Sequence, residues 1–176
     1  MSRIHFESNL EKIDSLYLFR FPKSASATLP SRGMVLVEGN INDSHFRSVL
    51  EPDGKGSHWL AVDKGLLDAI HGKVGDAYVL DVAPAEDWPE PTIPSDLLAA
   101  LTTATNAHTL WKNITPMARW DWIRWIRSTK QPETRKRRIE VAISKLKAGT
   151  RRPCCFNRTM CTVPDVSNNG VLFEAM

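Results

Sequence analysis

The chain has few cysteines and no long hydrophobic run. Three of its 176 residues are cysteines, at positions 154, 155 and 161. Two are adjacent, which is poor geometry for a mutual disulfide, and no C-x-x-C motif occurs. This usage excludes a disulfide-stabilised secreted scaffold and fits a reducing compartment. The opening residues M-S-R-I-H-F-E-S hold no apolar signal segment, and no stretch is long enough to cross a bilayer, so we predict a cytoplasmic protein.

The sequence also lacks the short motifs of the common enzyme families. It contains no G-x-S-x-G, H-E-x-x-H, EF-hand or dinucleotide-binding motif. Four of the histidines show no metal-ligand spacing such as H-x-x-x-H: His5, His45, His71 and His108. We therefore predict no metal, no cofactor and no assigned catalytic residue, and we favour a binding protein over an enzyme.

The first half does contain a series of short strand patterns. The clearest is M-V-L-V-E-G-N-I at residues 34–41, and Asn42-Asp43 follows where a two-residue hairpin turn is expected. Asp63 is placed to cap a short helix that ends at Ile70. About six strands with tight turns predict a small β-barrel over residues 1–84. The predicted strands are 4–6, 16–21, 34–41, 45–50, 59–62 and 77–82, with a short helix at 24–29 across one end.

A proline-rich stretch separates this region from the rest. Residues 85–94 hold three prolines and three acids, which predicts an extended linker. Residues 95–156 predict about three helices, so the fold class is α+β. Residues 157–176 show no clear period and are predicted to be a mobile tail, in which residues 171–173 dock as an edge strand. Ser95 is the expected cap of the first helix, whose predicted core residues are Leu97, Leu98, Leu101 and Trp111.

The last two predicted helices form a hairpin. Thr115 is a good N-cap with Pro116 at the first helical position, and Pro132 begins the second helix. Gly149 ends that helix, and the link at 128–131 is short enough for antiparallel packing. Asp121 and Arg124 fall outside the apolar arc of the first helix. The predicted core positions are Trp120, Trp122, Ile123, Ile126, Ile139, Ala142, Ile143 and Leu146.

Positive charge is concentrated in this hairpin. Residues 119–152 carry twelve Lys and Arg against three acids, a net charge of +9, so the remainder of the +3 chain is at −6. One interpretation is a solvated helix face with ion pairs, in which Arg135 covers the core and meets an acid. The other is a polyanion-binding surface, with weak, non-specific nucleic-acid binding. The candidate residues of that surface are Arg124, Trp125, Lys136 and Arg137, where Trp125 lies on the polar side of the helix and is free to stack.

The hairpin resembles the C-terminal part of the YdeI/OmpD-associated, or bacteriocin-protection, family. The residues that carry this resemblance are Trp111, then I-T-P-M-A-R-W-D-W-I-R-W-I and K-Q-P-E-T-R-K-R-R-I. The first half resembles the small β-barrel domain of unknown function that often precedes this helical part. It does so through Arg32-Gly33, G-N-I-N-D-S-H-F, P-D-G-K-G-S-H-W-L and the V-G-D turn, although Asp43 stands where a glycine is expected. The resemblance implies tolerance of bacteriocins or cationic antimicrobial peptides and supplies no catalytic residue.

One loop holds the candidate ligand residues of the barrel. Gly54-Lys55-Gly56-Ser57 lacks the first glycine of a phosphate-binding P-loop, and a surface turn is the simpler interpretation. Its amides and Lys55 would still suit a small anion. His58 borders the loop without an evident nucleophile or orienting acid. The predicted ligand-binding set is Lys55, Ser57, His58 and Trp59.

Three functions follow from these observations. The leading prediction is a non-enzymatic binding or stress-protection protein of the YdeI/OmpD-associated type, with a small anion or a protein as its partner. The first alternative is a small-molecule enzyme whose site lies at the barrel mouth near His58. The second is a nucleic-acid-binding protein that uses the basic helices.

Overall fold

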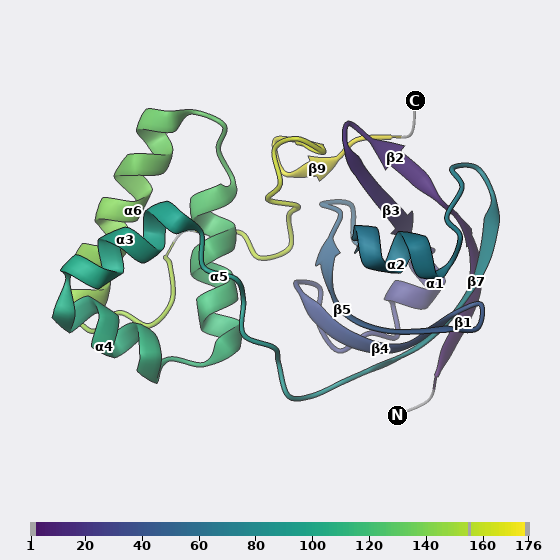
Figure 1. The fold of residues 1–176 in the computed structure, drawn as a ribbon, viewed down its shortest axis with the longest axis horizontal. Helices are drawn as coiled ribbons and strands as arrows, with labels where there is room; N and C mark the ends of the chain where they lie inside the picture. Colours follow the sequence, from purple (N-terminus) through teal and green to yellow (C-terminus); the bar gives the residue numbers. More distant parts are fainter. Residues whose placement is uncertain (1–2, 155, 175–176) are drawn as a thin grey trace. The chain divides into compact units, whose positions relative to one another are not determined.

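A computed structural model describes residues 3–154 and 156–174 of the chain (Figure 1). Its contacts divide these residues into two compact units. The N-terminal unit comprises residues 3–87 with 158–161 and 165–174, and the helical unit comprises the remaining described residues from 88 to 164. The first is built on a curled antiparallel sheet and the second on helices, which confirms the predicted α+β class.

Seven strands, rather than about six, form the sheet of the N-terminal unit, in the order β1-β7-β4-β5-β6-β3-β2. The strand absent from the prediction is β2, a three-residue segment that pairs with β3 around a turn in which Asp14 has a φ of 55°. So short a strand has too few residues to show an alternating pattern. The strands are β1 (Ile4–Asn9), β2 (Glu11–Ile13), β3 (Leu16–Arg20), β4 (Val35–Ile41), β5 (Ser44–Pro52), β6 (His58–Val62) and β7 (Ala77–Pro84).

The predicted hairpin joins β4 to β5. Ile41 pairs with Ser44, which leaves the expected two-residue turn. Asn42 takes the left-handed conformation with a φ of 50°, and its side-chain oxygen accepts a hydrogen bond of 2.9 Å from the amide of Val79. Asparagine tolerates that conformation better than most residues. The positive φ therefore falls on Asn42, and Asp43 does not need to be glycine.

The inward side chains of the sheet form one hydrophobic core, which includes Phe19, Val37, Leu60 and Leu80. Two short helices belong to this unit, α1 (Lys23–Ser26) and α2 (Lys64–Ala69). Asp63 caps α2 as predicted, because its carboxylate accepts from the amide of Leu66 at 2.8 Å. At Gly39 a Cβ would lie 1.9 Å from the carbonyl oxygen of Asp81, so only glycine permits the close approach of β4 and β7.

Four helices, rather than about three, build the helical unit: α3 (Ser95–Thr103), α4 (Thr105–Asn113), α5 (Pro116–Arg127) and α6 (Pro132–Lys147). The additional break is at Ala104, whose φ of −120° and ψ of 79° are not helical. The hydroxyls of Thr102 and Thr103 donate hydrogen bonds to carbonyls of the preceding turn. Such side-chain hydrogen bonds to the backbone slightly destabilise a helix. Leu98 was predicted to be a core residue, but it faces solvent with 43% of its surface exposed.

The helix ends of the predicted hairpin are confirmed. The Thr115 hydroxyl accepts from the amide of Ala118 at 3.1 Å at the start of α5. At the end of α6, Gly149 has a φ of 90°, its amide bonds to Leu146 and the amide of Thr150 bonds to Lys145. These two bonds are those of a Schellman motif. The side chains of α5 and α6 share one core, as predicted: Ile123, Ile126, Ile139 and Leu146 are buried in it and Ile143 packs against it.

Residues beyond the helical unit return to the N-terminal unit. There β8 (Ser167–Asn168) pairs with β9 (Val171–Leu172), and both Val166 and Leu172 are buried. The Leu172 amide donates to the carbonyl of Asp53 at 2.9 Å. A Cβ at Gly54 would lie 2.5 Å from the carbonyl oxygen of Gly170, so the hairpin packs directly on the β5–β6 loop. Cys155, one of the three cysteines considered above, lies outside the described residues.

Candidate functional site

The β5–β6 loop is held by one of its own carboxylates. Asp53 Oδ1 accepts from the amide of Lys55 at 2.7 Å and from the amide of Ser57 at 3.0 Å. These are the loop donors that we expected to bind a small anion. An incoming anion would have to displace Asp53 from them. The ammonium of Lys55 is paired with Glu174 at 2.5 Å.

Next to this loop lies a closed network of buried polar groups. His58 is 1% exposed; its Nδ1 lies 3.0 Å from the hydroxyl of Ser26, and its Nε2 lies 2.9 Å from the carbonyl oxygen of Gly33. The Ser57 hydroxyl donates to the Phe21 carbonyl at 2.7 Å. Burial lowers the pKa of His58, which favours the neutral ring. Both ring nitrogens are occupied, so this histidine joins α1 and the segment that precedes β4 to β6.

Of the predicted ligand-binding residues, Lys55 alone is at the surface. Ser57, His58 and Trp59 are each at most 4% exposed. The indole N–H of Trp59 has no hydrogen-bond partner among the described residues. The structure thus places Lys55 and Ser57 in the β5–β6 loop and His58 and Trp59 at the start of β6, with all but Lys55 inside the protein.

Several basic side chains of the helical unit are also buried. Arg119 is 8% exposed, and its Nη1 donates to the carbonyls of Trp111, at 3.0 Å, and Ile114, at 2.5 Å. These carbonyls lie at the C-terminal end of α4, where a helix leaves its acceptors without intrahelical partners. The rest of the guanidinium pairs with Glu90. Arg138 likewise donates to the Trp125 carbonyl near the end of α5, at 2.8 Å.

Asp121 and Arg124 were expected on the polar face of α5, yet they are 1% and 0% exposed. Asp121 accepts from Arg152 at 2.7 Å, which shows how a buried carboxylate is compensated. Trp125 is half-buried, with the guanidinium of Arg138 5.6 Å from its ring centre. Among the four proposed polyanion-binding residues, the structure therefore leaves Lys136 and Arg137 exposed, on α6.

Arg135 has the arrangement that its helical phase predicts. It forms two hydrogen bonds with the carboxylate of Asp96 on α3, at 2.7 and 3.1 Å. The hydrogen bonds from this guanidinium lower the pKa of Asp96, and the carboxylate raises the pKa of Arg135. The pair joins two helices of the unit and so serves the fold.

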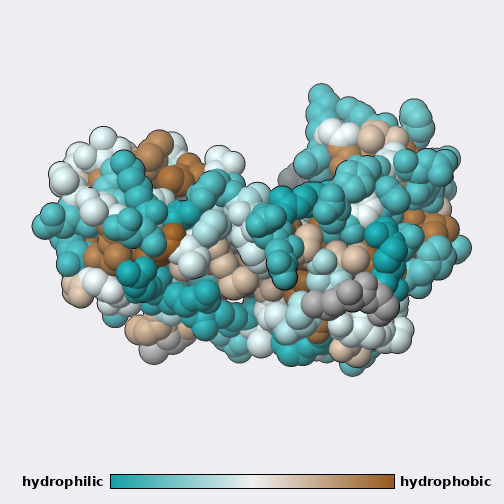
Figure 2. Space-filling model, turned by 90° about the horizontal axis from the view of Figure 1, so that it is seen from below, coloured by the Kyte–Doolittle hydropathy of each residue, from teal (hydrophilic) through white to brown (hydrophobic). Residues whose placement is uncertain are grey.

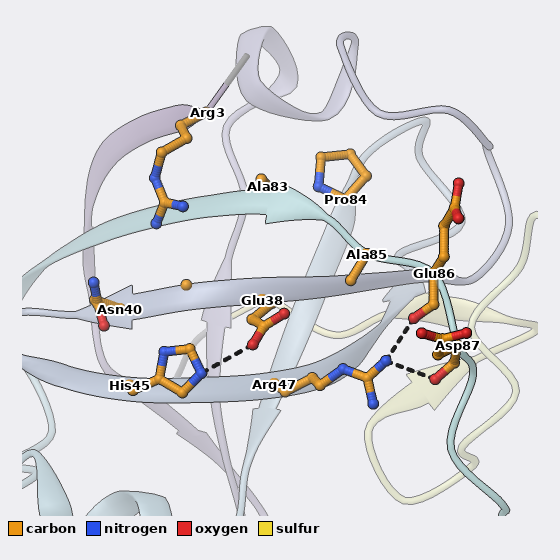
Figure 3. Close-up of a pocket in the computed structure, with 11 residues that line it drawn as sticks. Arg3, Glu38, Asn40, His45, Arg47, Ala83, Pro84, Ala85, Glu86 and Asp87 are labelled. Atoms are coloured by element: carbon orange, nitrogen blue, oxygen red, sulfur yellow. Dashed lines mark hydrogen bonds and ion pairs between the residues drawn. The ribbon is translucent and has the colours of Figure 1, made fainter. Parts of the chain in front are cut away.

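The sequence did not indicate a polar groove that lies on the outer face of the sheet (Figure 3). Its volume is about 560 Å³, within the range of roughly 300–1,000 Å³ typical of ligand sites. Neighbouring strands supply its floor, because the sheet register sets Glu38 opposite Arg47 and Asn40 opposite His45. We call it the outer groove; it is lined by Arg3, residues 38–40, His45, Arg47 and residues 83–87.

Charges of both signs line the outer groove, and hydrogen bonds hold them in place. The guanidinium of Arg47 donates to the carbonyls of Glu86 and Asp87 at 2.5 and 2.6 Å, which folds residues 84–87 into one wall. Near the middle, His45 Nε2 lies 3.1 Å from Glu38 Oε1. Arg3 forms the opposite edge and is fixed by the carboxylate and the carbonyl of Asp81, each at 3.0 Å.

A faint signal for this groove is present in the sequence. In V-E-G-N-I and in H-F-R, on the two sides of the Asn42-Asp43 turn, polar residues alternate with apolar ones, and alternation places the polar set on one outer face. What the sequence could not show is that the predicted strand at 77–82, β7, pairs with β4, and that residues 84–87 return to form a wall. Both lie about forty residues away in the chain and meet the hairpin only through the sheet order.

Other kinds of site find no support in the described part of the chain. No group of three His, Cys, Asp or Glu residues is placed there to hold a metal ion. None of its helices has the length and apolarity required to span a membrane. On the face shown in Figure 2, hydrophobic side chains form small separate patches among hydrophilic ones.

The fold and the groove define a two-domain protein, in which a barrel-like sheet domain with a polar outer face is joined to a helical domain. Two family models match it. Residues 6–82 match the Domain of unknown function (DUF1905), and residues 90–149 match the family Bacteriocin-protection, YdeI or OmpD-Associated. These two matches, with the domain of unknown function on the N-terminal side of the YdeI/OmpD-associated region, confirm the resemblance seen in the sequence. The comparison with curated proteins found no match.

Proposed function

We propose that this protein is a non-enzymatic, cytoplasmic binding protein that holds a cationic peptide in the outer groove of its N-terminal unit. The observation that carries the proposal is the groove itself: an open polar hollow of about 560 Å³ whose charged walls are fixed by hydrogen bonds. Fixed walls reduce the entropy lost when a ligand binds.

The charge of the lining favours a cationic ligand. Three carboxylates line the groove, on Glu38, Glu86 and Asp87, against two guanidinium groups. The guanidinium of Arg47 is already bound by two carbonyls, whereas the carboxylates of Glu86 and Asp87 are exposed. A peptide with lysine or arginine side chains would complement these acids, and its polar backbone would meet Asn40 and His45.

The lining is better suited to binding than to chemistry. None of the eleven residues that line the groove is a serine, threonine, cysteine, lysine or tyrosine, so its lining offers no hydroxyl, thiol or amine nucleophile. The histidine that borders the β5–β6 loop is buried, with both of its nitrogens occupied. A general base needs access to the proton that it removes, and His58 lacks such access.

The family description adds a physiological direction. The helical domain matches a family described as bacteriocin-protection proteins, and the family resemblance implies tolerance of bacteriocins or cationic antimicrobial peptides. We infer that binding such a peptide lowers its free concentration in the cell, and that this sequestration is the stress-protection function.

Calorimetric titration of the full chain with a lysine-rich peptide, an uncharged peptide and an acidic peptide of equal length tests the proposal. We expect measurable binding of the lysine-rich peptide alone, weakened by salt because the contacts are exposed. The triple variant E38Q/E86Q/D87N should reduce the affinity about tenfold, since each exposed charge pair contributes only about 0–1 kcal/mol.

The matched control is the variant E7Q/E133Q/E140Q, which removes three exposed carboxylates outside the groove. It should bind as the unmodified chain does. Equal weakening in both triple variants would show that net charge, and not the groove, attracts the peptide. Survival of a sensitive bacterium that expresses each variant then tests the protection: only the groove variant should lose it.

A further inference from the structure

One row of outward side chains crosses the four strands that carry the outer groove. The sheet register sets Ala83 of β7 opposite Glu38 of β4, and it sets Glu38 opposite Arg47 of β5. The pairing of β1 with β7, carried back by one residue, sets Arg3 opposite Ala83. The row therefore runs from Arg3 through Ala83 and Glu38 to Arg47, and all four residues line the groove.

Ala83 leaves a gap in this row between a cation and an anion. Its methyl group is far smaller than the side chains on either side of it, those of Arg3 and Glu38, and Figure 3 shows the guanidinium of Arg3 lying over β7. Neighbouring strands lie about 4.8 Å apart, so two strand intervals separate the backbones of Arg3 and Glu38 by about 10 Å. The floor of the groove thus presents one positive and one negative group with a hollow between them.

The guanidinium of Arg3 is fixed and still has a donor to offer. Nε donates to the carboxylate of Asp81 and Nη2 to its carbonyl, each at 3.0 Å. Nη1 lies on the opposite edge of the planar group, makes no hydrogen bond to any described residue, and belongs to a side chain that is 51% exposed. Among the described residues that line the groove, Arg3 is included and Asp81 is not. A guanidinium held in this way loses little freedom when it binds a carboxylate.

We propose that Arg3 binds the C-terminal carboxylate of the cationic peptide, so that the outer groove recognises the end of a peptide chain and sets its direction. This inference rests on the proposed function, because it takes the cationic peptide as the occupant of the groove. With the carboxylate at Arg3, the last side chain of the peptide extends over Ala83 toward Glu38. A lysine or arginine at that position complements the Glu38 carboxylate, and the preceding residues continue toward Glu86 and Asp87.

Calorimetric titration of the full chain with two forms of one lysine-rich peptide tests the recognition of the terminus. Both forms are acetylated at the N-terminus; one ends in a free carboxylate and the other in an amide. The amide form carries one more net positive charge, so attraction by charge alone would make it the tighter ligand. We expect the free acid to bind about fivefold more tightly, which is the upper end of what one exposed charge pair contributes. Equal or tighter binding of the amide form would overturn the proposal, whereas the proposed function would stand if E38Q/E86Q/D87N weakened both forms.

A pair of variants locates the recognition at Arg3. R3Q removes the guanidinium and should abolish the fivefold ratio between the affinities of the acid and the amide. The ratio is the useful quantity, because any general change in stability or charge affects both peptides alike. R137Q removes an exposed guanidinium on α6, outside the groove, and should leave the ratio unchanged. A full ratio in R3Q would overturn the proposal.

A second pair of peptides tests the direction. Both end in a free carboxylate and have the same composition, but one carries its two lysines at the last two positions and the other at the first two. We expect tighter binding of the first, because its lysines lie next to the carboxylate, as Glu38 lies across Ala83 from Arg3. Equal affinities would overturn the proposal. If none of these peptides binds, the groove does not hold cationic peptides, and the proposed function fails together with this inference.

Discussion

The two units of this protein use charged side chains in different ways. On the sheet of the N-terminal unit, polar and charged side chains pair across neighbouring strands and stay in contact with water, as Glu38 and His45 do at 48% and 65% exposure. In the helical unit, Arg119 and Asp121 are almost entirely buried and satisfy backbone or side-chain groups inside the fold. Positive charge in a sequence is therefore a poor guide to positive charge on a surface.

The difference has a physical origin. A sheet satisfies its backbone groups within its own ladder, so outward side chains remain available for ligands. Each helix leaves four carbonyls without partners at its C-terminal end. In the helical unit arginines supply the missing donors, from Arg119 to the end of α4 and from Arg138 to the end of α5.

The largest effect is expected in the hydrophobic core of the helical unit. Leu146 is 1% exposed and packs in the shared core of α5 and α6. The substitution Leu146→Ala should lower the free energy of unfolding by roughly 2–5 kcal/mol, because it removes buried methyl groups and leaves a cavity. Urea denaturation measures the change, with Lys147→Ala at the adjacent exposed position as control. A loss below about 1 kcal/mol would contradict the packing of this hairpin.

A smaller loss of stability than that of Leu146→Ala is expected when a buried arginine is removed, and it tests the difference between buried and exposed basic side chains. Arg119→Ala should destabilise the protein by about 1–3 kcal/mol, because the carbonyls of Trp111 and Ile114 lose their donor. Removing the exposed charges together, in Lys136→Ala with Arg137→Ala, should change stability by no more than about 0.5 kcal/mol. Similar losses of unfolding free energy in both variants would show that the basic segment is not divided into buried structural arginines and exposed, structurally neutral charges.

The smallest expected effect is the pH dependence of stability, and it arises from His58 in the N-terminal unit. Burial lowers the pKa of His58, so at pH values between its folded and unfolded pKa the unfolded chain binds more protons. Stability should therefore be complete above about pH 6.5 and fall as the pH decreases below it, with a slope of at most about 1.4 kcal/mol per pH unit.

Urea midpoints of the unmodified chain and of His58→Gln between pH 7.5 and 5.5 measure this slope. The variant should be less stable at pH 7.5, because it loses a hydrogen-bonded ring, but its pH dependence in this window should be reduced. Five of the six tryptophans belong to the helical unit, with Trp59 the exception, so tryptophan fluorescence reports mainly on that unit. An unchanged slope in the variant would assign the pH dependence to another group.

Much of the fold could be predicted from the sequence because its signals are local. Caps such as Thr115 and Asp63, the stop at Gly149 and the strands around Asn42 depend on neighbouring residues, and each is confirmed. Leu98, Asp121 and Arg124 were placed wrongly because helical phase alone does not tell which other helices cover a face. The burial of a charged residue depends on partners such as Arg152, which the phase of one helix cannot reveal.

The candidate site was harder to predict for the same reason. The P-D-G-K-G-S-H-W segment attracts attention as a motif, yet its donors bind Asp53 and its histidine is buried. The outer groove, in contrast, has no contiguous motif. It needs strand pairing to bring residues 38–47 beside 83–87, and pairing over such distances is a property of the folded sheet.

The returning hairpin of β8 and β9 has a consequence for how the protein is synthesised. The helical unit lies, in chain order, between the first and last parts of the N-terminal unit. During translation the entire helical unit is therefore synthesised before the residues that pack on Gly54 and Asp53. The N-terminal unit is the first to leave the ribosome and the last to be completed. Until the β8–β9 hairpin has been made, the β5–β6 loop is not covered by it and is accessible to chaperones and proteases.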